Sequence, residues 1–312
     1  MTSVIQLSTP SALLEARGAR VSVDDVVALE GLTFVARGDR VLCAGDTQAL
    51  FAAVSGMPLM PRGQATPGDA PGEARVVAGS LLLAGRDVSR AEQLSVMGVA
   101  PLDPPLPPAW TAEAYVTWSA RLGGAGAFVA RGTAAASLTL VGLGHARHRR
   151  LDGLALPERR AMMLAAAIVL SPEVVVLEDP LSGLDGMAAA FVLSAIAAAT
   201  RGRRALISTG RLDRTGPTGA LVGGASDLLV LSAGELVFAG TPADASGGRR
   251  LFALVVRGQT ESLQEALSAR GLTLRAGAGR LLVSLPEGAS TRAIVEAAAE
   301  VRAPIVEMVP VI

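Results

Sequence analysis

Residues 154–185 read "LALPERRAMMLAAAIVLSPEVVVLEDPLSGLD" and contain an apolar helix, a proline and a continuous apolar strand. The run "PEVVVLEDP" has no polar alternation, which is typical of a strand buried on both faces. Two more runs of this kind follow, "RRALIST" at 203–209 and "DLLVLSAGELVFAG" at 227–240, with apolar helices between the strands. Continuous apolar strands that alternate with helices predict a parallel sheet covered by helices.

The sequence around this stretch divides into further regions. Residues 14–99 hold strand-like runs and a Pro/Gly-rich insert at about 57–74, which is expected to be a flexible surface loop. Residues 101–171 are predicted to be a helical subdomain that begins with the proline-rich "PLDPPLPPAW". After residue 246 the pattern restarts as strand, helix, two strands, helix and strand, the order of a ferredoxin-like unit. The expected domains are therefore 1–246 and 247–312.

Composition limits the possible functions. The chain has 312 residues, half of them hydrophobic, and a formal net charge of zero, so a broad nucleic-acid surface is not expected. All 28 basic residues are arginine, and lysine chemistry is therefore excluded. The single cysteine, Cys43, lies in an apolar run and is expected to be a buried strand residue. His145 and His148 lie in "GHARHRR", an expected exposed loop, so no metal site is predicted.

The N-terminal residues lack the basic and apolar regions of a signal peptide. The longest apolar run, "AMMLAAAIVL", is about half the length of a membrane span. A soluble, cytoplasmic protein is the expectation.

The stretch 154–185 resembles the most distinctive segment of the ATP-binding subunits of ABC transporters. Those subunits carry a signature loop of the form LSGGQ, a helix, a proline, a strand ending in Asp-Glu, and a Ser-Ala/Gly-Leu-Asp loop. The spacing from Leu154 to Pro172 agrees residue for residue, and the resemblance covers about Leu14 to Asp244. It implies an α/β P-loop NTPase fold, a three-layer ABC ATPase-like domain with a helical subdomain. The ferredoxin-like C-terminal domain resembles an add-on of some drug-exporter-type subunits.

The family's phosphate loop, G-x-x-x-x-G-K-[ST], corresponds here to the turn within "VARGDRVLCAGDTQALFAAVSG", residues 35–56. Gly45, Asp46, Thr47 and Gln48 remain, and the loop is about four residues shorter than the motif requires. The second glycine, the lysine and the hydroxyl residue are missing. Asp46 would place a carboxylate where a phosphate binds, and the side chain of Asp46 or Thr47 is expected to cap the helix.

The resemblance also assigns the remaining motif positions, and most of them differ from the family. Glu178 and Asp179 reverse the Asp-Glu order, and a shift of about 1 Å in a carboxylate can cost about 100-fold in rate. Gly210 stands for the histidine that contacts the outer phosphate, Leu102 for the magnesium-sensing glutamine, and Val23 for the aromatic residue that stacks on adenine.

The signature loop is Leu154, Ala155, Leu156, Pro157 and Glu158. Ala155 lacks the hydroxyl, Leu156 blocks close backbone approach, and Pro157 lacks an N–H but suits the first turn of a helix.

One functional loop is retained, namely Ser182, Gly183, Leu184 and Asp185. In the family this loop crosses the dimer interface, so an interface role is one interpretation. The other is that the turn simply connects the strand to the next helix.

Aromatic residues are concentrated in "PPAWTAEAYVTWSARL", which holds both tryptophans, Trp110 and Trp118, and the only tyrosine, Tyr115. In the family this region contacts the permease. These side chains belong either to the subdomain core or to a docking surface, and at least one of them is predicted to be exposed. Trp110, at the loop–helix junction, is the preferred anchor.

Two functions follow. The first is a subunit that lacks nucleotide chemistry and needs no cofactor, a structural or regulatory partner of an active homologous subunit (or of itself) and a transmembrane permease. It would reach the inner face of the cell membrane only through those partners. The second is a working ATPase that uses ATP-Mg at an unorthodox or partner-completed site. A recruited scaffold without a transport role is a third possibility.

Overall fold

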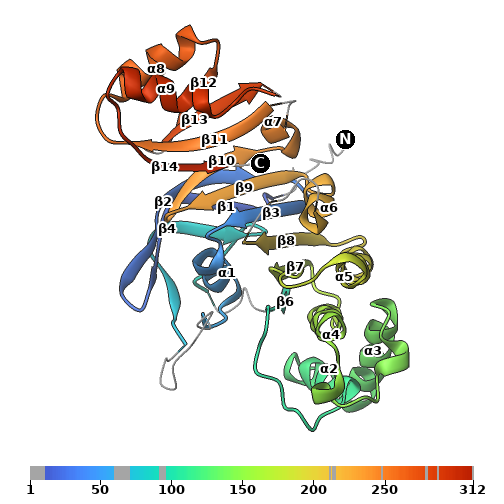
Figure 1. Cartoon of the computed structure of the whole chain (residues 1–312). Helices are drawn as coiled ribbons and strands as arrows, with labels where there is room; N and C mark the ends of the chain where they lie inside the picture. Colours follow the sequence, from blue (N-terminus) through green and yellow to red (C-terminus); the bar gives the residue numbers. More distant parts are fainter. Residues whose placement is uncertain are drawn as a thin grey trace, which may run out of the picture.

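The computed structural model describes residues 11–59, 71–90, 96–210, 212, 216–246, 249–277, 280–286 and 288–310. The described residues form three sheets, with helices packed against them (Figure 1). Most of the predicted insert at 57–74 lies outside the described residues, as does the N-terminal decapeptide.

The central sheet has the strand order β10-β9-β3-β8-β7-β6, and all neighbouring strands are parallel except the β10–β9 pair. Its strands are β3 (Arg40–Gly45), β6 (Met97–Ala100), β7 (Val174–Glu178), β8 (Arg204–Thr209), β9 (Asp227–Ser232) and β10 (Glu235–Gly240). The parallel sheet predicted from the apolar runs is therefore confirmed.

Both faces of the central sheet are buried, in two separate cores. Leu42 and Ala44 of β3 face the core that contains α4 (Leu156–Ile168) and α5 (Gly186–Ala199). Val41 and Cys43 face the other core, which contains α1 (Gln48–Ser55). Burial raises the pKa of the Cys43 thiol to about 12. Cys43 is thus the buried strand residue that was expected.

A second, antiparallel sheet covers α1 and has the order β2-β1-β4-β5. Its strands are β1 (Leu14–Val23), β2 (Val26–Ala36), β4 (Ala74–Leu83) and β5 (Arg86–Asp87). Sequence analysis did not single out β1, because arginines and a glycine interrupt its apolar residues. Val23 ends β1 and packs at the edge of this core.

The helical subdomain consists of α2 (Ala112–Leu122), α3 (Ala127–Leu140) and short turns before α4. Helix α2 begins where Thr111 accepts a hydrogen bond from the Ala114 N–H at 3.1 Å. Segment 101–111 connects β6 to this subdomain (Figure 1).

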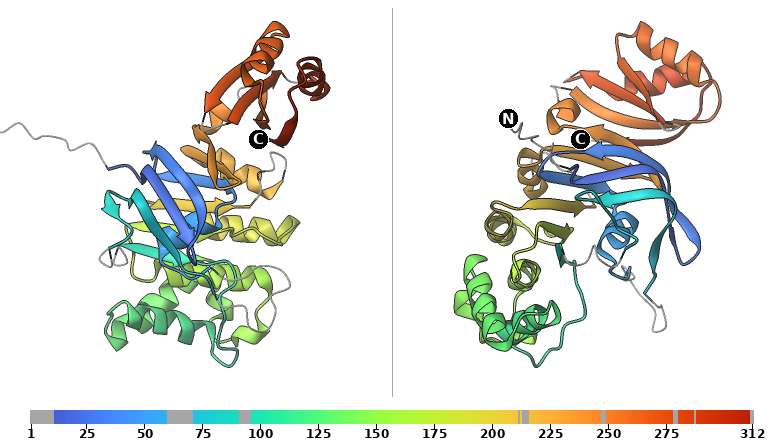
Figure 2. Two further views of the ribbon diagram at one scale, coloured as in Figure 1. Left: turned by 90° about the vertical axis from the view of Figure 1, so that its left-hand side faces the viewer. Right: turned by 180° about the vertical axis from the view of Figure 1, so that it is seen from behind.

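The C-terminal domain folds as β11 (Arg249–Val256), α8 (Thr260–Ala269), β12 (Thr273–Gly277), β13 (Arg280–Pro286), α9 (Arg292–Glu300) and β14 (Ile305–Pro310). Its antiparallel sheet has the order β12-β13-β11-β14, so the ferredoxin-like fold is confirmed. Short helices α6 (Pro217–Gly223) and α7 (Pro242–Ser246) precede it. The C-terminal domain and the helical subdomain lie at opposite ends of the molecule (Figure 2).

Candidate functional site

The turn after β3 is fastened to the hairpin between β9 and β10. Gly45 has φ +87°, and a Cβ at this position would lie 2.0 Å from the Leu231 carbonyl oxygen. The Asp46 N–H donates to the same carbonyl at 3.1 Å. The Asp46 carboxylate accepts from the Ala233 N–H at 2.8 Å. The residues that stand where a phosphate loop would be are thus engaged with a neighbouring turn of the protein.

The expectation of a side-chain cap on α1 is wrong. Thr47 is the N-cap residue, yet within the described residues its hydroxyl accepts no hydrogen bond from the first turn, which starts at Gln48. The Asp46 carboxylate accepts instead from the Ala233 N–H. Thr47 contributes to the start of the helix through its backbone, because its carbonyl accepts from the Phe51 N–H at 2.8 Å.

Four of the sequence-predicted positions meet at the end of β7. The Glu178 carboxylate accepts from the Leu102 N–H at 3.0 Å. Asp179 is buried, has φ +39°, and accepts from the Thr209 hydroxyl at 3.3 Å. A Cβ on Gly210 would lie 3.6 Å from the Asp179 carboxylate. Both carboxylates therefore serve as acceptors for neighbouring parts of the chain.

The signature-loop positions form an ordinary helix start. Ala155 is the N-cap of α4, and Pro157 occupies its first turn, as the sequence predicted. The Glu158 carboxylate reaches back to the Ala155 N–H at 2.9 Å and also accepts from Arg149 at 2.7 Å. Leu154 is buried in the core.

The retained loop at 182–185 makes the turn between β7 and α5. The Ser182 N–H donates to the Asp179 carbonyl at 3.0 Å, and Gly183 has φ +71°. Leu184 packs partly against the core, and Asp185 is the N-cap residue of α5. The loop thus serves as a connecting turn, and a partner interface on it stays a prediction.

The aromatic residues of 110–118 are partly exposed. Trp110 and Trp118 are 38% and 44% exposed, and their rings meet edge to face with centroids 5.8 Å apart. The Tyr115 ring lies 6.0 Å from that of Trp118, and burial raises the pKa of its hydroxyl. The prediction that at least one of the three is exposed is confirmed.

These aromatic side chains line a cavity of about 930 Å³ beside the end of β7. The other lining residues come from three segments: Met57, Pro58 and Pro71; Pro101, Leu102, Asp103, Pro104, Pro105 and Pro107; and Glu178.

A buried arginine in the same region was missed by sequence analysis. Arg160 of α4 is 5% exposed, and it donates to both carboxylate oxygens of Asp103 at 2.8 and 3.2 Å. Its Nε is buried without a hydrogen-bond partner among the described atoms. The available signal was the position of Arg160 on the apolar stripe of a helix, four residues before Leu164.

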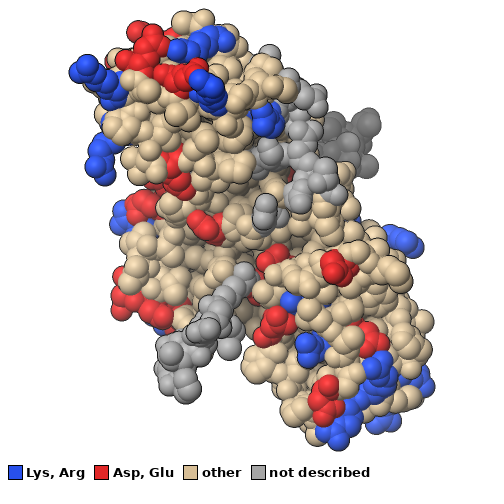
Figure 3. All heavy atoms as spheres, in the orientation of Figure 1, with Lys and Arg blue, Asp and Glu red and all other residues tan. Residues whose placement is uncertain are grey.

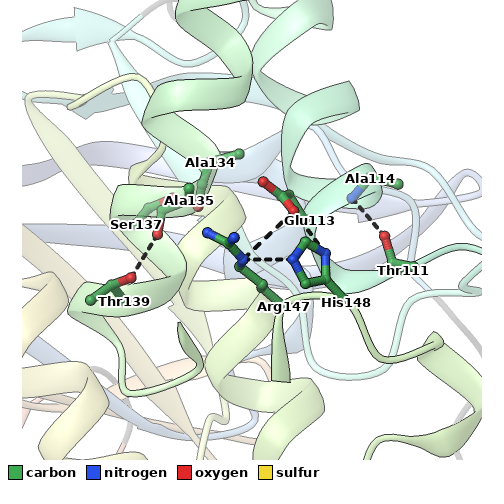
Figure 4. Close-up of polar contacts among 9 residues, drawn as sticks. All are labelled: Thr111, Glu113, Ala114, Ala134, Ala135, Ser137, Thr139, Arg147 and His148. Carbon is green, nitrogen blue, oxygen red and sulfur yellow. Dashed lines mark hydrogen bonds and ion pairs between the residues drawn. The ribbon is translucent and has the colours of Figure 1, made fainter. Parts of the chain in front are cut away.

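The two histidines lie in the segment between α3 and α4, against the first turns of two helices. His148 Nδ1 is 3.2 Å from the Glu113 carboxylate of α2, and Arg147 Nε donates to His148 Nε2 at 2.8 Å (Figure 4). His145 lies 3.8 Å from Glu158. Positive and negative side chains are intermingled on this end of the molecule (Figure 3). Among the described residues, no three His, Cys, Asp or Glu side chains form a group suited to a metal ion.

No protein-family model matches the chain. It is similar to human ATP-binding cassette sub-family G member 5, with 32% identity over 94 residues, which is 30% of this chain and 14% of the human protein. The mouse and rat proteins of that name are 34% and 31% identical over 95 and 117 residues. The chain thus spans only 14% to 17% of the length of these curated relatives.

A solved structure shares the fold. It is cbiO1 from Clostridium perfringens, described as part of the ABC transporter complex cbiONQ. The TM-score is 0.60 at 15% identity, and the match covers 83% of this chain and 95% of that one. The shared fold extends over most of the chain.

Proposed function

We propose that this chain, which carries an ABC-transporter ATP-binding domain, has lost nucleotide chemistry and acts as a structural or regulatory partner. The proposed partners are an active homologous subunit, a transmembrane permease, or both. The observation that carries the proposal is the turn Gly45–Gln48, which is fastened to Leu231 and Ala233.

A phosphate site needs successive free backbone N–H groups and a cation. The Asp46 N–H is already donated to Leu231, and the Asp46 carboxylate stands one residue before the N-cap of α1, where it would repel a phosphate. Lysine is absent from the whole sequence. Each of these features opposes the binding of a triphosphate at this turn.

The residues at the end of β7 support the same proposal. Glu178 and Asp179 accept hydrogen bonds from Leu102 and Thr209, so they hold together the segments that meet there. Gly210 has no side chain with which to contact a phosphate. The carboxylate pair therefore has a structural role that needs neither metal nor nucleotide.

The proposed partners rest on an analogy with a solved complex and on the retained loop 182–185. The solved relative cbiO1 is part of an ABC transporter complex. No helix among the described residues is long and apolar enough to span a bilayer. By analogy with that complex, this chain would reach the membrane through a permease, and the loop 182–185 would contact a second subunit.

Purified protein is expected to release no phosphate from ATP-magnesium above the buffer blank, because Gly210 has no side chain to contact the outer phosphate and the reversed pair Glu178–Asp179 accepts hydrogen bonds from Leu102 and Thr209. Asp179→Asn should leave this background unchanged. The measurement is phosphate release with magnesium, together with a melting curve for each variant. A turnover that is abolished by Asp179→Asn in a variant that still folds would contradict the proposal.

Trp110→Ala is expected to cost only about 1 kcal/mol of stability, since the residue loses one aromatic contact at a partly exposed position. Co-purification with a membrane partner from native cells should be lost. Phe128→Ala is the matched control, because Phe128 is 93% exposed on α3 and lies outside the cavity. A fall of many degrees in the melting temperature would place Trp110 in the core and contradict the docking role.

A further inference from the structure

The cavity beside the end of β7 has the size and lining of a small-molecule site. Its volume of about 930 Å³ lies within the range of about 300–1,000 Å³ that is usual for ligand pockets. Six prolines make up much of the wall, namely Pro58, Pro71, Pro101, Pro104, Pro105 and Pro107. Proline has a fixed φ and no backbone N–H, so these walls are stiff and offer an apolar surface with few donors.

Three aromatic rings form one side of the cavity. Trp110 and Trp118 are perpendicular to each other at an interplanar angle of 84°, and Tyr115 is tilted by 43° to Trp118. Rings at such angles can surround a rounded group on more than one side. The face of an aromatic ring carries negative charge density and attracts cations, most strongly for tryptophan.

The lining of the cavity also includes two carboxylates. Among the described residues, the ionisable side chains that line the cavity, apart from Tyr115, are Asp103 and Glu178. Asp103 is 63% exposed and is held in place by Arg160, which is not a lining residue. Because Arg160 offsets the charge of Asp103, the described part of the wall offers the aromatic faces and the Glu178 carboxylate, and its described lining residues include no cationic side chain.

We propose that this cavity binds a hydrophobic organic cation, of the quaternary ammonium or phosphonium class. The apolar part of the ligand contacts the prolines, and its charged centre lies against the aromatic rings and the Glu178 carboxylate. This site goes beyond the proposed function and does not depend on it, because a chain that does bind ATP could also bind such a cation.

The test uses the full-length purified chain and two ions of the same shape and opposite charge, tetraphenylphosphonium and tetraphenylborate. Trp110 and Trp118 are the two tryptophans of the chain and both line the cavity, so intrinsic fluorescence reports on it directly. The expected result is saturable quenching by the phosphonium, with an affinity at least ten-fold higher than that for the borate.

Variants examined by calorimetry locate the site. Glu178→Gln and Trp118→Ala should each weaken phosphonium binding by about ten-fold, whereas Phe128→Ala should leave it unchanged, with melting curves to show that each variant folds. Equal binding of the two ions, or a phosphonium affinity that neither variant changes, would overturn the proposal. The proposal also fails if neither ion saturates the fluorescence. Loss of co-purification in Trp110→Ala would then indicate that the cavity is a protein-docking surface.

Discussion

Gly45→Ala is expected to lower the free energy of unfolding by about 2–5 kcal/mol. A left-handed φ of +87° at a non-glycine residue costs about 1–2 kcal/mol, and overpacking typically adds about 1–3 kcal/mol. The added Cβ would lie 2.0 Å from the Leu231 carbonyl oxygen, which belongs to the backbone of a central strand and cannot move cheaply. Urea denaturation of the two proteins gives the difference.

Gly210→Ala is the matched control, because Gly210 also stands at a position that contacts phosphate in the family. Its Cβ would meet the Asp179 carboxylate at 3.6 Å, an ordinary van der Waals distance, so the change in stability should stay below about 1 kcal/mol. This contrast would show that Gly45 is required by packing against β9 even where no phosphate binds. Unchanged stability of Gly45→Ala would refute this explanation of the turn.

Asp103→Ala is expected to cost about 3 kcal/mol, although Asp103 is 63% exposed, because the substitution leaves the guanidinium of Arg160 buried without its carboxylate. Arg160→Met should cost less. It removes the buried charge together with the Nε that lacks a partner, and it leaves only an exposed carboxylate behind. The two substitutions differ in stability because Asp103→Ala leaves an unpaired charge buried, whereas Arg160→Met does not.

The double variant and a surface control test this reasoning. Asp103→Ala combined with Arg160→Met should be about as stable as Arg160→Met alone, since neighbouring substitutions are not additive. Asp39→Ala removes a carboxylate that is 89% exposed and 3.9 Å from Arg204, and it should change stability by less than about 0.5 kcal/mol. The proposed role of the pair would be contradicted if the stability losses of the two single variants added up in the double variant. It would also be contradicted if Asp103→Ala lost no more stability than Asp39→Ala.

Much of the fold could be predicted because the elements have clear periods. The predicted helix "AEAYVTWSARL" is α2 residue for residue, and the C-terminal order of strands and helices agrees with the structure. Strand β1 was missed because two arginines, Arg17 and Arg20, interrupt its apolar residues, so its apolar face is recognisable only once β2 and β4 lie beside it. A regular hydrophobic period can be recognised in a single sequence, whereas a partly apolar strand can be recognised only when its neighbouring strands are known.

The direction of individual polar side chains could not be predicted in the same way. Asp46 was expected at the start of α1, yet its carboxylate binds the N–H of Ala233, which is 187 residues later in the chain. The pair of Asp103 and Arg160 spans 57 residues. Local rules describe what a side chain can do near its own backbone, and contacts over such distances in the sequence override them.

The affinity for ATP-magnesium should be measured by calorimetry on the purified chain, with a melting curve at the same ligand concentrations. We expect no saturable heat and no rise in melting temperature up to millimolar ATP, since the Asp46 and Thr47 N–H groups are already donated to the Leu231 and Gly45 carbonyls and the sequence has no lysine. Micromolar binding would instead stabilise the protein by about 2.7 kcal/mol at a hundred-fold excess over Kd. Such binding, with the matching rise in melting temperature, would contradict the loss of the nucleotide site.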